Sequence, residues 1–202
     1  MRIIGITGPS GSGKGVLSKY MADTFGFMVI DADKVYHGIV SSPSDCVKEL
    51  SLAFGEDVLT DGGGIDRKRL SSKVFGDKNK DNLLLLNKIT HKFVIAEINK
   101  MLEEYSIQGV EVCVIDAPLL IEAGINEMCD LCLAVIADKN IRAERIARRD
   151  GIDIEAAFRR IESQKPDSYY IDSTDKVIYN ERGIDEMVAQ LNSYLKNRSF
   201  IN

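Results

Sequence analysis

The sequence lacks an excess of basic residues. Such an excess is typical of proteins that bind nucleic acid through its phosphates. Its 202 residues include 26 lysines and arginines against 31 aspartates and glutamates, which gives a formal net charge of −5. Because such binding depends on an extended positive surface, we expect no nucleic-acid partner. Positive charge that holds a phosphate group must therefore be local.

Long apolar runs are missing as well. No segment approaches the roughly 18 to 20 consecutive apolar residues that cross a bilayer. The apolar opening at residues 3–6 is interrupted by Gly5 and does not have the length of a signal peptide. We therefore expect no membrane partner.

The chain has only four cysteines, namely Cys46, Cys113, Cys129 and Cys132. A chain of this size with 45% hydrophobic residues needs no disulfide framework, so we expect reduced thiols and a cytoplasmic location. Cys129 and Cys132 form a C-x-x-C pair, but no second pair or neighbouring histidine completes a zinc site. They lie in an apolar stretch typical of a strand, and we expect no metal there.

Short apolar runs rich in β-branched residues alternate with longer segments of helical periodicity, the pattern of βαβ units around a parallel sheet. The predicted strands cover residues 2–7, 27–31, 110–116, 130–137 and 176–179. The predicted helices cover residues 14–25, 81–105, 140–150, 153–164 and 184–196. Because the strands are almost continuously apolar, helices should cover both faces of the sheet. The sequence therefore predicts an α/β fold, a three-layer α/β/α sandwich around five parallel strands.

A chain of this length is predicted to form a single domain, residues 1–202, with two appended features. Residues 32–105, between the second and third predicted strands, show no convincing strand, and Gly62-Gly63-Gly64 marks a flexible turn between helical pieces. This insertion is predicted to be a helical subdomain that binds a substrate. A charged helix pair around Gly151, at residues 142–165, is predicted to be a small lid.

The strongest motif lies directly after the first predicted strand and directly before the first predicted helix. It is the run Gly8-Pro9-Ser10-Gly11-Ser12-Gly13-Lys14, which matches the Walker A pattern of P-loop proteins. Glycines let the backbone fold around an anion with its N–H groups inward, and the following helix adds the positive end of its dipole. Lys14 is predicted to reach the β- and γ-phosphates. The residues predicted to bind ATP are Gly8, Gly11, Ser12, Gly13, Lys14, Gly15 and Val16.

Residue 15 departs from the usual pattern. Most P-loop proteins carry there a Ser or Thr whose hydroxyl binds Mg²⁺, whereas this chain has Gly15, and Val16 offers no oxygen. Mg²⁺ is therefore expected to be held by nucleotide phosphates, by water and by a carboxylate elsewhere. The Lys14-Gly15 pair resembles the loop of nucleoside monophosphate kinases, and that of cytidylate kinase in particular.

Carboxylates follow two of the predicted strands, at the edge where doubly wound folds bind ligands. The second strand ends in Asp31-Ala32-Asp33, and positions two apart in a strand face the same way. A carboxylate there can accept a proton from an attacking hydroxyl and organise the waters of Mg²⁺, which gives Asp33 a catalytic and a metal role. Asp33 is also a candidate helix N-cap. The third strand closes with Asp116, which resembles a Walker B aspartate and is predicted to hold Mg²⁺ through water.

Four arginines lie on the helix after the fourth predicted strand, namely Arg142, Arg145, Arg148 and Arg149. Arg142, Arg145 and Arg149 are three and four residues apart, on one helix face. A charged helix face is often merely solvated, but phosphoryl transfer needs positive charge around the moving group, and the loop supplies only one lysine. We therefore predict catalytic roles for Arg145 and Arg149 beside Lys14.

Beyond this loop, a series of ordered segments resembles the dephospho-coenzyme A kinase family over nearly the whole chain. The segments are residues 30–33, 65–70, 74–75, 118–122 and 175–180, together with His91, Arg145, Arg149, Asp150 and Gln164. No single segment is very specific, but their joint occurrence is. Cytidylate kinases would not supply the Pro-Leu-Leu-Ile-Glu stretch at residues 118–122.

The resemblance implies ATP-dependent phosphorylation of the ribose 3′-hydroxyl of dephospho-coenzyme A, which gives coenzyme A and ADP. It implies Asp33 as the base, Lys14 as the phosphate anchor, and Arg145 and Arg149 as lid charges. Asn180 is expected to contact the nucleotide. The residues expected to contact the acceptor are Asp33, Phe75, His91, Leu119 and Glu122. We expect a monomer or a weak homo-oligomer.

Two other functions stay open from the sequence. One is a nucleoside monophosphate kinase of the cytidylate type, which the Lys14-Gly15 pair favours. The other is a nucleotide-binding module without catalysis, suggested by the missing hydroxyl at Gly15. Lys14, Asp33 and the arginines argue against the second alternative, since a binding module needs no carboxylate on the acceptor side.

Overall fold

The structure, a computed structural model, describes residues 1–75 and 79–201. The chain forms two compact units, one made of Met1–Ile30 with Tyr105–Asn202 and the other of Asp31–Glu104. We refer to them as the sheet unit and the helical unit. The helical unit contains most of the predicted insertion at residues 32–105, and the acceptor-binding role of that insertion stays a prediction.

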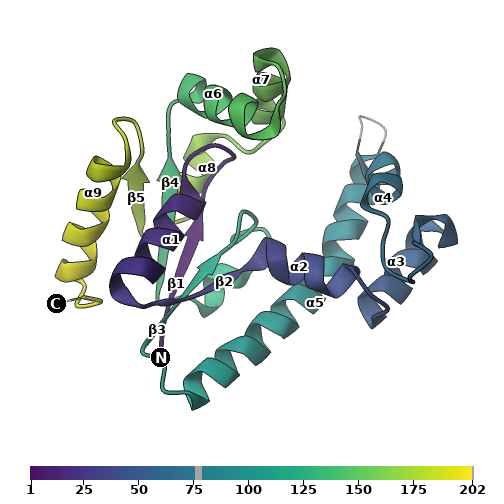
Figure 1. Ribbon diagram of the computed structural model, residues 1–202, viewed down its shortest axis with the longest axis horizontal. Coiled ribbons are helices and arrows are strands. Elements are labelled where there is room, and N and C mark those ends of the chain that lie inside the picture. Colours follow the sequence, from purple (N-terminus) through teal and green to yellow (C-terminus); the bar gives the residue numbers. More distant parts are fainter. Residues whose placement is uncertain (76–78, 202) are drawn as a thin grey trace. The chain divides into compact units, whose positions relative to one another are not determined.

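A five-stranded parallel sheet organises the sheet unit. It is built from β1 (Arg2–Thr7), β2 (Met28–Asp31), β3 (Val112–Asp116), β4 (Leu131–Ile136) and β5 (Lys176–Tyr179), in the order β2-β3-β1-β4-β5 (Figure 1). β1 pairs in parallel with β3 and β4, and β4 pairs in parallel with β5. The five predicted strands are confirmed, each within two residues of its predicted bounds. Because β1 is central, the loop that follows it leaves the middle of the carboxyl edge of the sheet.

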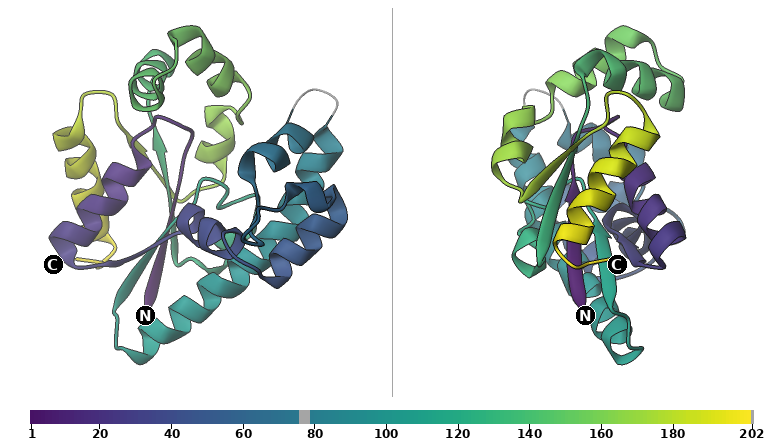
Figure 2. Two further views of the ribbon diagram at one scale, coloured as in Figure 1. Left: turned by 45° about the vertical axis from the view of Figure 1, so that its right-hand side comes forward. Right: turned by 90° about the vertical axis from the view of Figure 1, so that its left-hand side faces the viewer.

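Helices cover both faces of the sheet, as its continuously apolar strands predict. On one face lie α1 (Lys14–Phe25) and α9 (Ile184–Asn197), and on the other lies α8 (Asp167–Asp172) (Figure 2). Side chains of β4 alternate between these faces: Leu131, Leu133 and Val135 join the core beneath α1 and α9, whereas Ala134 and Ile136 contact Tyr170 of α8. α8 was not predicted, because six residues are too few to show a helical period.

A helix pair extends from the sheet unit after β4. α6 (Lys139–Asp150) ends at Gly151, whose φ of 65° is left-handed, and α7 (Ile154–Glu162) follows. The two helices pack through Ala143 and Ile146 of α6 and through Ala157 and Ile161 of α7. This pair coincides with the predicted charged helices around residue 151, and its role as a lid stays a prediction.

The helical unit contains α2 (Ala32–Val40), α3 (Asp45–Phe54), the short 3₁₀ helix η1 (Glu56–Val58), α4 (Arg67–Val74) and most of α5 (Lys80–Ile107). Its apolar core has members in every one of these elements, including Val40, Leu50, Val58, Leu70 and Ile89. α5 is the longest helix, with 28 residues. In the described part of the chain, no helix combines the length and apolar character needed to cross a membrane.

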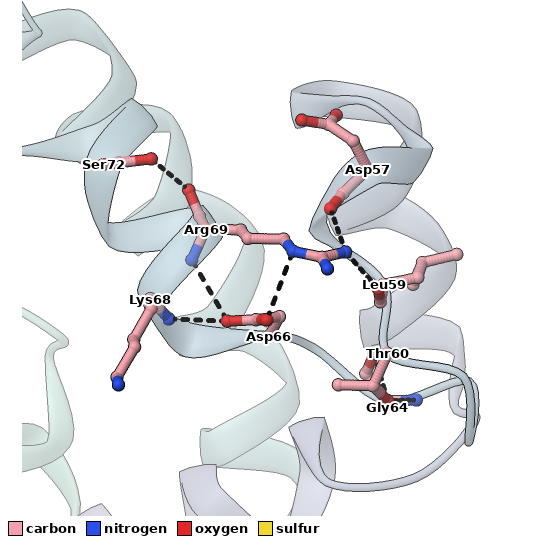
Figure 3. Close-up of polar contacts among 8 residues, drawn as sticks. All are labelled: Asp57, Leu59, Thr60, Gly64, Asp66, Lys68, Arg69 and Ser72. Atoms are coloured by element: carbon pink, nitrogen blue, oxygen red, sulfur yellow. Dashed lines mark hydrogen bonds and ion pairs between the residues drawn. The ribbon is translucent and has the colours of Figure 1, made fainter.

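The start of α4 is fixed by a network around Asp66 and Arg69 (Figure 3). The Asp66 carboxylate accepts the backbone N–H groups of Lys68 and Arg69 at 2.9 and 3.1 Å, which makes it the N-cap of the helix. The Arg69 guanidinium pairs with Asp66 at 3.3 Å and donates to the carbonyl oxygens of Asp57 and Leu59 at 3.1 and 3.2 Å. The charged residues Asp66 and Arg69 therefore hold the start of α4 against η1 and the residue that follows it.

All four cysteines are unpaired. Cys132 lies in β4, whereas Cys129 lies just before that strand, after the 3₁₀ helix η2 (Ile125–Met128). Burial raises the pKa of Cys46 to about 11 and that of Cys113 to about 12, so both thiols stay protonated at neutral pH.

Candidate active site

The loop between β1 and α1 has a shape that requires glycine at several positions, and Gly11 and Gly13 show why. Gly11 and Gly13 have φ of 80° and 103°, in the left-handed region that other residues rarely adopt. Space excludes side chains as well: a Cβ at Gly11 would lie 2.7 Å from the carbonyl oxygen of Arg142, and one at Gly13 would collide with the side-chain nitrogen of Asn180. α1 begins at Lys14, so a helix N-terminus opens directly at the loop.

The remaining predicted ATP-binding residues lie along the same segment. Gly8 follows β1 directly, and Ser12 is buried, with a hydroxyl oxygen that has no hydrogen-bond partner among the described residues. Gly15 and Val16 are exposed in the first turn of α1. The structure therefore brings these residues together at one helix N-terminus, and their contacts with ATP stay predictions.

Arg145 and Asn180 bind the backbone of this loop. Asn180 is buried, and its side-chain nitrogen donates to the carbonyl oxygen of Ser12 at 2.8 Å. Arg145 donates to the carbonyl oxygens of Gly11 and Ser12 at 3.3 and 3.4 Å. It also donates to the backbone and side-chain oxygens of Asn180 at 3.3 and 3.2 Å. These bonds fix the loop from the side of α6 and of the residue that follows β5.

Lys14 and Asp116 are neighbours at the carboxyl edge of the sheet. The pairing of β1 with β3 aligns Ile6 with Asp116, so the last residue of β3 lies beside the start of the loop. The Lys14 ammonium forms an ion pair with one carboxylate oxygen of Asp116, which is 6% exposed. A bound nucleotide phosphate would offer this ammonium a second anion. The lysine of the Walker A motif and the aspartate predicted to resemble Walker B thus share one site, although 102 residues separate them.

The oxygen atoms of Asp116 suit Mg²⁺. This ion prefers oxygen ligands, keeps several waters and is usually bound through one or two carboxylates plus substrate phosphates. Among the described residues, Lys14 pairs with Oδ1 and Ser18 donates to Oδ2, and each carboxylate oxygen has two lone pairs. Within residues 1–75 and 79–201, no group of three or more histidines, cysteines, aspartates or glutamates is placed to hold a metal ion. The donors therefore fit a metal held mainly by water and nucleotide.

The other aligned arginines of α6 have different partners from Arg145. Arg142 is 5% exposed and pairs with Asp167 at 3.2 Å. Arg149 donates to Asp150 at 2.7 and 2.9 Å, and Asp150 also pairs with Arg160 of α7. The two arginines beside Asp150 lower the pKa of its carboxyl to about 2. Alignment on one helix face therefore does not give these arginines a common contact.

The local geometry predicted for Asp33 is wrong. β2 ends at Asp31 and α2 begins at Ala32, so Asp33 lies in the first turn of a helix and the alternation of side chains along a strand does not apply to it. The N-cap of this helix is Asp31, whose carboxylate accepts the backbone N–H of Lys34 at 3.0 Å. Asp33 is exposed. Its roles at the hydroxyl and at the metal stay predictions.

The residues predicted to contact the acceptor are spread over both units. Phe75 follows α4 and is exposed. His91 lies in α5, where burial lowers its pKa and leaves Nε2 without a hydrogen-bond partner in the described part of the chain. Leu119 and Glu122 follow β3 and are exposed; burial and the Glu122 carboxylate raise the pKa of Tyr169. The contacts of these four residues with an acceptor stay predictions.

Three residues at this site had no predicted role. Ser18 donates to Asp116 at 2.6 Å, the side-chain oxygen of Gln164 accepts the backbone N–H of Ser10 at 3.1 Å, and Asp167 pairs with Arg142. Ser18 had a recognisable signal, because it is a hydroxyl at a buried position of α1, one turn after Gly15. Gln164 was named among the residues of the family resemblance, but without a role. Asp167 lies in a polar segment, and nothing local distinguishes it from a solvated residue.

Comparisons with known proteins assign a family. Residues 2–186 match the family model described as Dephospho-CoA kinase. A dephospho-CoA kinase of Fusobacterium nucleatum is 38% identical over 192 residues, which cover 95% of this chain and 96% of the relative.

Solved structures agree with the fold. A crystal structure from Thermus thermophilus matches with a TM-score of 0.76 and 27% identity, over 97% of each chain. The structure of a dephospho-CoA kinase from Campylobacter jejuni matches with a TM-score of 0.68 and 24% identity, over 98% of this chain and 100% of the other, and shows the shared fold. The family match favours dephospho-CoA kinase over the cytidylate-type kinase that the Lys14-Gly15 pair left open. This chain belongs to the dephospho-CoA kinase family.

Proposed function

We propose that this chain transfers the γ-phosphoryl group of ATP to the ribose 3′-hydroxyl of dephospho-CoA, giving CoA and ADP. The observation that carries the proposal is the match of residues 2–186 to the dephospho-CoA kinase family. The loop between β1 and α1, with Lys14 beside Asp116, supports the nucleotide half of the reaction. Because phosphoryl transfer involves little covalent chemistry by the protein, its residues act mainly by positioning and by charge.

On the nucleotide side, Lys14 holds the β- and γ-phosphates, and the loop from Gly8 to Gly13 contributes backbone N–H groups at the positive end of α1. Asn180 contacts the nucleotide at the loop that it already binds through Ser12. The ion pair of Lys14 with Asp116 supports this assignment, because it holds the ammonium beside the loop.

On the acceptor side, Asp33 accepts or orients the proton of the attacking hydroxyl. Its position in the first turn of α2 supports this role, since the helix dipole favours a carboxylate there. Phe75, His91, Leu119 and Glu122 contact the rest of the acceptor. The helices of segment 32–105 act as the acceptor-binding insertion.

Positive charge and the metal complete the site. Arg145 and Arg149 stabilise the charge of the moving phosphoryl group, and residues 142–165 act as a lid. Mg²⁺, when bound, neutralises charge on the β- and γ-phosphates. Asp116 would order the waters of the ion, and Asp33 is a second candidate for that role.

The partner that we propose is dephospho-CoA, with no nucleic-acid or membrane partner. A net charge of −5 supports the absence of a nucleic-acid partner. Four unpaired cysteines support a cytoplasmic location, where thiols stay reduced. We propose a monomer or a weak homo-oligomer.

The test compares three reactions of the purified chain with ATP and Mg²⁺, containing dephospho-CoA, cytidine monophosphate or no acceptor. ADP should form quickly only with dephospho-CoA. Lys14→Ala should lower ATP affinity and turnover together, because the lysine contacts phosphate charge in the ground state and in the transition state. Equal or faster ADP formation with cytidine monophosphate would reject the proposed acceptor, and ADP binding without any transfer would mark a binding module.

A further inference from the structure

The surroundings of Gly15 show how the site manages without a hydroxyl at residue 15. A Cβ built at Gly15 would meet one atom within 4 Å, the Asp116 oxygen Oδ2 at 4.0 Å. Open space therefore lies where most P-loops place a Ser or Thr side chain, and Asp116 borders that space.

A hydroxyl reaches this same carboxylate oxygen from one helical turn further along α1. Ser18 is 4% exposed, and its Oγ donates to Asp116 Oδ2 at 2.6 Å. The same Oγ also lies 3.2 Å from the carbonyl oxygen of Gly15. A hydroxyl has one hydrogen, and the shorter contact is to an ionised acceptor, which is the stronger kind of hydrogen bond. The Ser18 hydrogen therefore points to Asp116.

α1 thus holds both oxygens of the Asp116 carboxylate. Lys14 pairs with Oδ1 and Ser18 donates to Oδ2. When a phosphate attracts the Lys14 ammonium, the Ser18 hydroxyl remains a hydrogen-bond partner of Asp116. This partner matters because Asp116 is only 6% exposed to water. Without the Ser18 hydroxyl, the buried Oδ2 atom would lose its hydrogen-bond partner, and the carboxylate would be free to turn away from the orientation that serves the metal.

We propose that Ser18 is a positioning residue that compensates for Gly15: it holds the Asp116 carboxylate in the orientation from which it would order the waters of Mg²⁺. The inference rests on the proposed nucleotide and metal site, and it is independent of the acceptor. It identifies which residue takes over part of the task of the missing hydroxyl. Partners that orient a metal-binding group from outside its ligand shell typically change metal affinity by roughly 10- to 100-fold when removed.

The experiment measures binding of a fluorescent ADP analogue, without any acceptor, across a Mg²⁺ titration and in excess chelator. Ser18→Ala should raise the Mg²⁺ concentration for half-maximal binding by about tenfold. Affinity in chelator should stay within about twofold of the wild type, because the buried Ser18 hydroxyl donates to Asp116 and acts through it. The Mg²⁺ dependence of ATP turnover should shift in parallel.

A second variant tests the compensation itself. A hydroxyl one bond beyond the Cβ at residue 15 comes within hydrogen-bonding reach of Asp116 Oδ2, so Gly15→Ser in the Ser18→Ala background should bring the Mg²⁺ requirement back toward that of the wild type. In an Asp116→Asn background, Ser18→Ala should have little further effect, because Ser18 acts through the carboxylate.

Several results would overturn the inference. One is a loss of nucleotide affinity by Ser18→Ala that is equal with and without Mg²⁺, which would mark Ser18 as a packing residue. The inference would also be overturned if Ser18→Ala left the Mg²⁺ requirement unchanged, or if adding Gly15→Ser to Ser18→Ala did not restore it. Nucleotide binding by the wild type that does not depend on Mg²⁺ would overturn it as well. Failure to phosphorylate dephospho-CoA with all these binding results intact would count against the proposed acceptor alone.

Discussion

Arg145 and Arg149 are one helical turn apart, yet their surroundings predict different consequences for nucleotide binding. Arg145 donates to Gly11, Ser12 and Asn180 at the phosphate-binding loop, whereas Arg149 donates to Asp150. Arg145 therefore helps to fix the shape of the phosphate-binding loop.

Arg145→Ala should weaken ADP binding by about tenfold or more, since a hydrogen bond to a charged group contributes about 1.5–3 kcal/mol and tenfold in affinity is about 1.4 kcal/mol. Arg149→Ala serves as the control and should leave ADP affinity nearly unchanged while lowering turnover. Titration calorimetry with ADP measures the first effect. Equal ADP affinities in the two variants would show that the bonds of Arg145 to the loop have no energetic role.

At this scale the sequence predicted residue types better than contacts. The Walker A run identified Lys14 because its pattern is local and strict, and the apolar strand before it identified Asp116. Ser18 and Asp116 are 98 residues apart, and Arg145 and Gly11 are 134 apart, so no local pattern contains their bonds. Such contacts exist only once the order of strands in the sheet is known.

Helix starts decide the next level of structure, and α4 is the clearest case. Asp66 accepts two backbone N–H groups and pairs with Arg69, so it satisfies donors that the first turn of a helix leaves open (Figure 3). Asp66→Ala should lower the melting temperature by about 2–4 °C. Asp66→Asn keeps a capping oxygen and should lower it by less. A melting temperature unchanged in both variants would mean that the cap adds nothing to stability.

The same cap has a predictable pH dependence. The backbone N–H of Arg69, and then that of Lys68, hold the pKa of Asp66 below its ordinary value of about 3.9. A lowered folded-state pKa means that the ionised carboxylate stabilises the fold above about pH 4 and that this contribution is lost as the pH falls further. The difference in melting temperature between the wild type and Asp66→Asn should therefore shrink in acid, as scanning calorimetry at several pH values can check.

Element prediction succeeded where patterns were long or continuous. α1 and β1 have the predicted bounds, since a glycine-rich loop separates them and Gly26 ends the helix. The end of β2 shows where such prediction fails. Asp31 and Asp33 were both assigned to the end of this strand, but α2 begins at Ala32, so Asp31 ends the strand and Asp33 lies in the helix. The extended and helical conformations meet there without a glycine or proline to mark the boundary.

At the scale of the whole molecule, the two units carry different halves of the proposed reaction. The phosphate-binding loop belongs to the sheet unit, and Asp33 belongs to the helical unit. The sequence predicted the α/β class because alternating helices and apolar strands leave few other solutions. It did not predict the strand order, because pairing between distant strands leaves no mark in the sequence of either one.

Asp33→Asn should lower turnover by roughly 10²-fold or more, the order that a positioned base contributes, while ADP affinity stays near that of the wild type. Asp31→Asn is the matched control, because asparagine caps a helix about as well as aspartate and should leave turnover nearly unchanged. Steady-state rates with dephospho-CoA and ADP titrations measure both quantities. Normal turnover in Asp33→Asn would remove this residue from the mechanism.

The position of the transferred phosphate tests the proposed function most directly. The purified chain is incubated with ATP, Mg²⁺ and dephospho-CoA, and the product is analysed by phosphorus–proton correlation NMR. A dephospho-CoA kinase should give a new phosphomonoester signal correlated with the proton on the 3′-carbon of the ribose, together with one ADP for each product molecule. A phosphate correlated with any other position, or ADP formed without a phosphorylated acceptor, would contradict it.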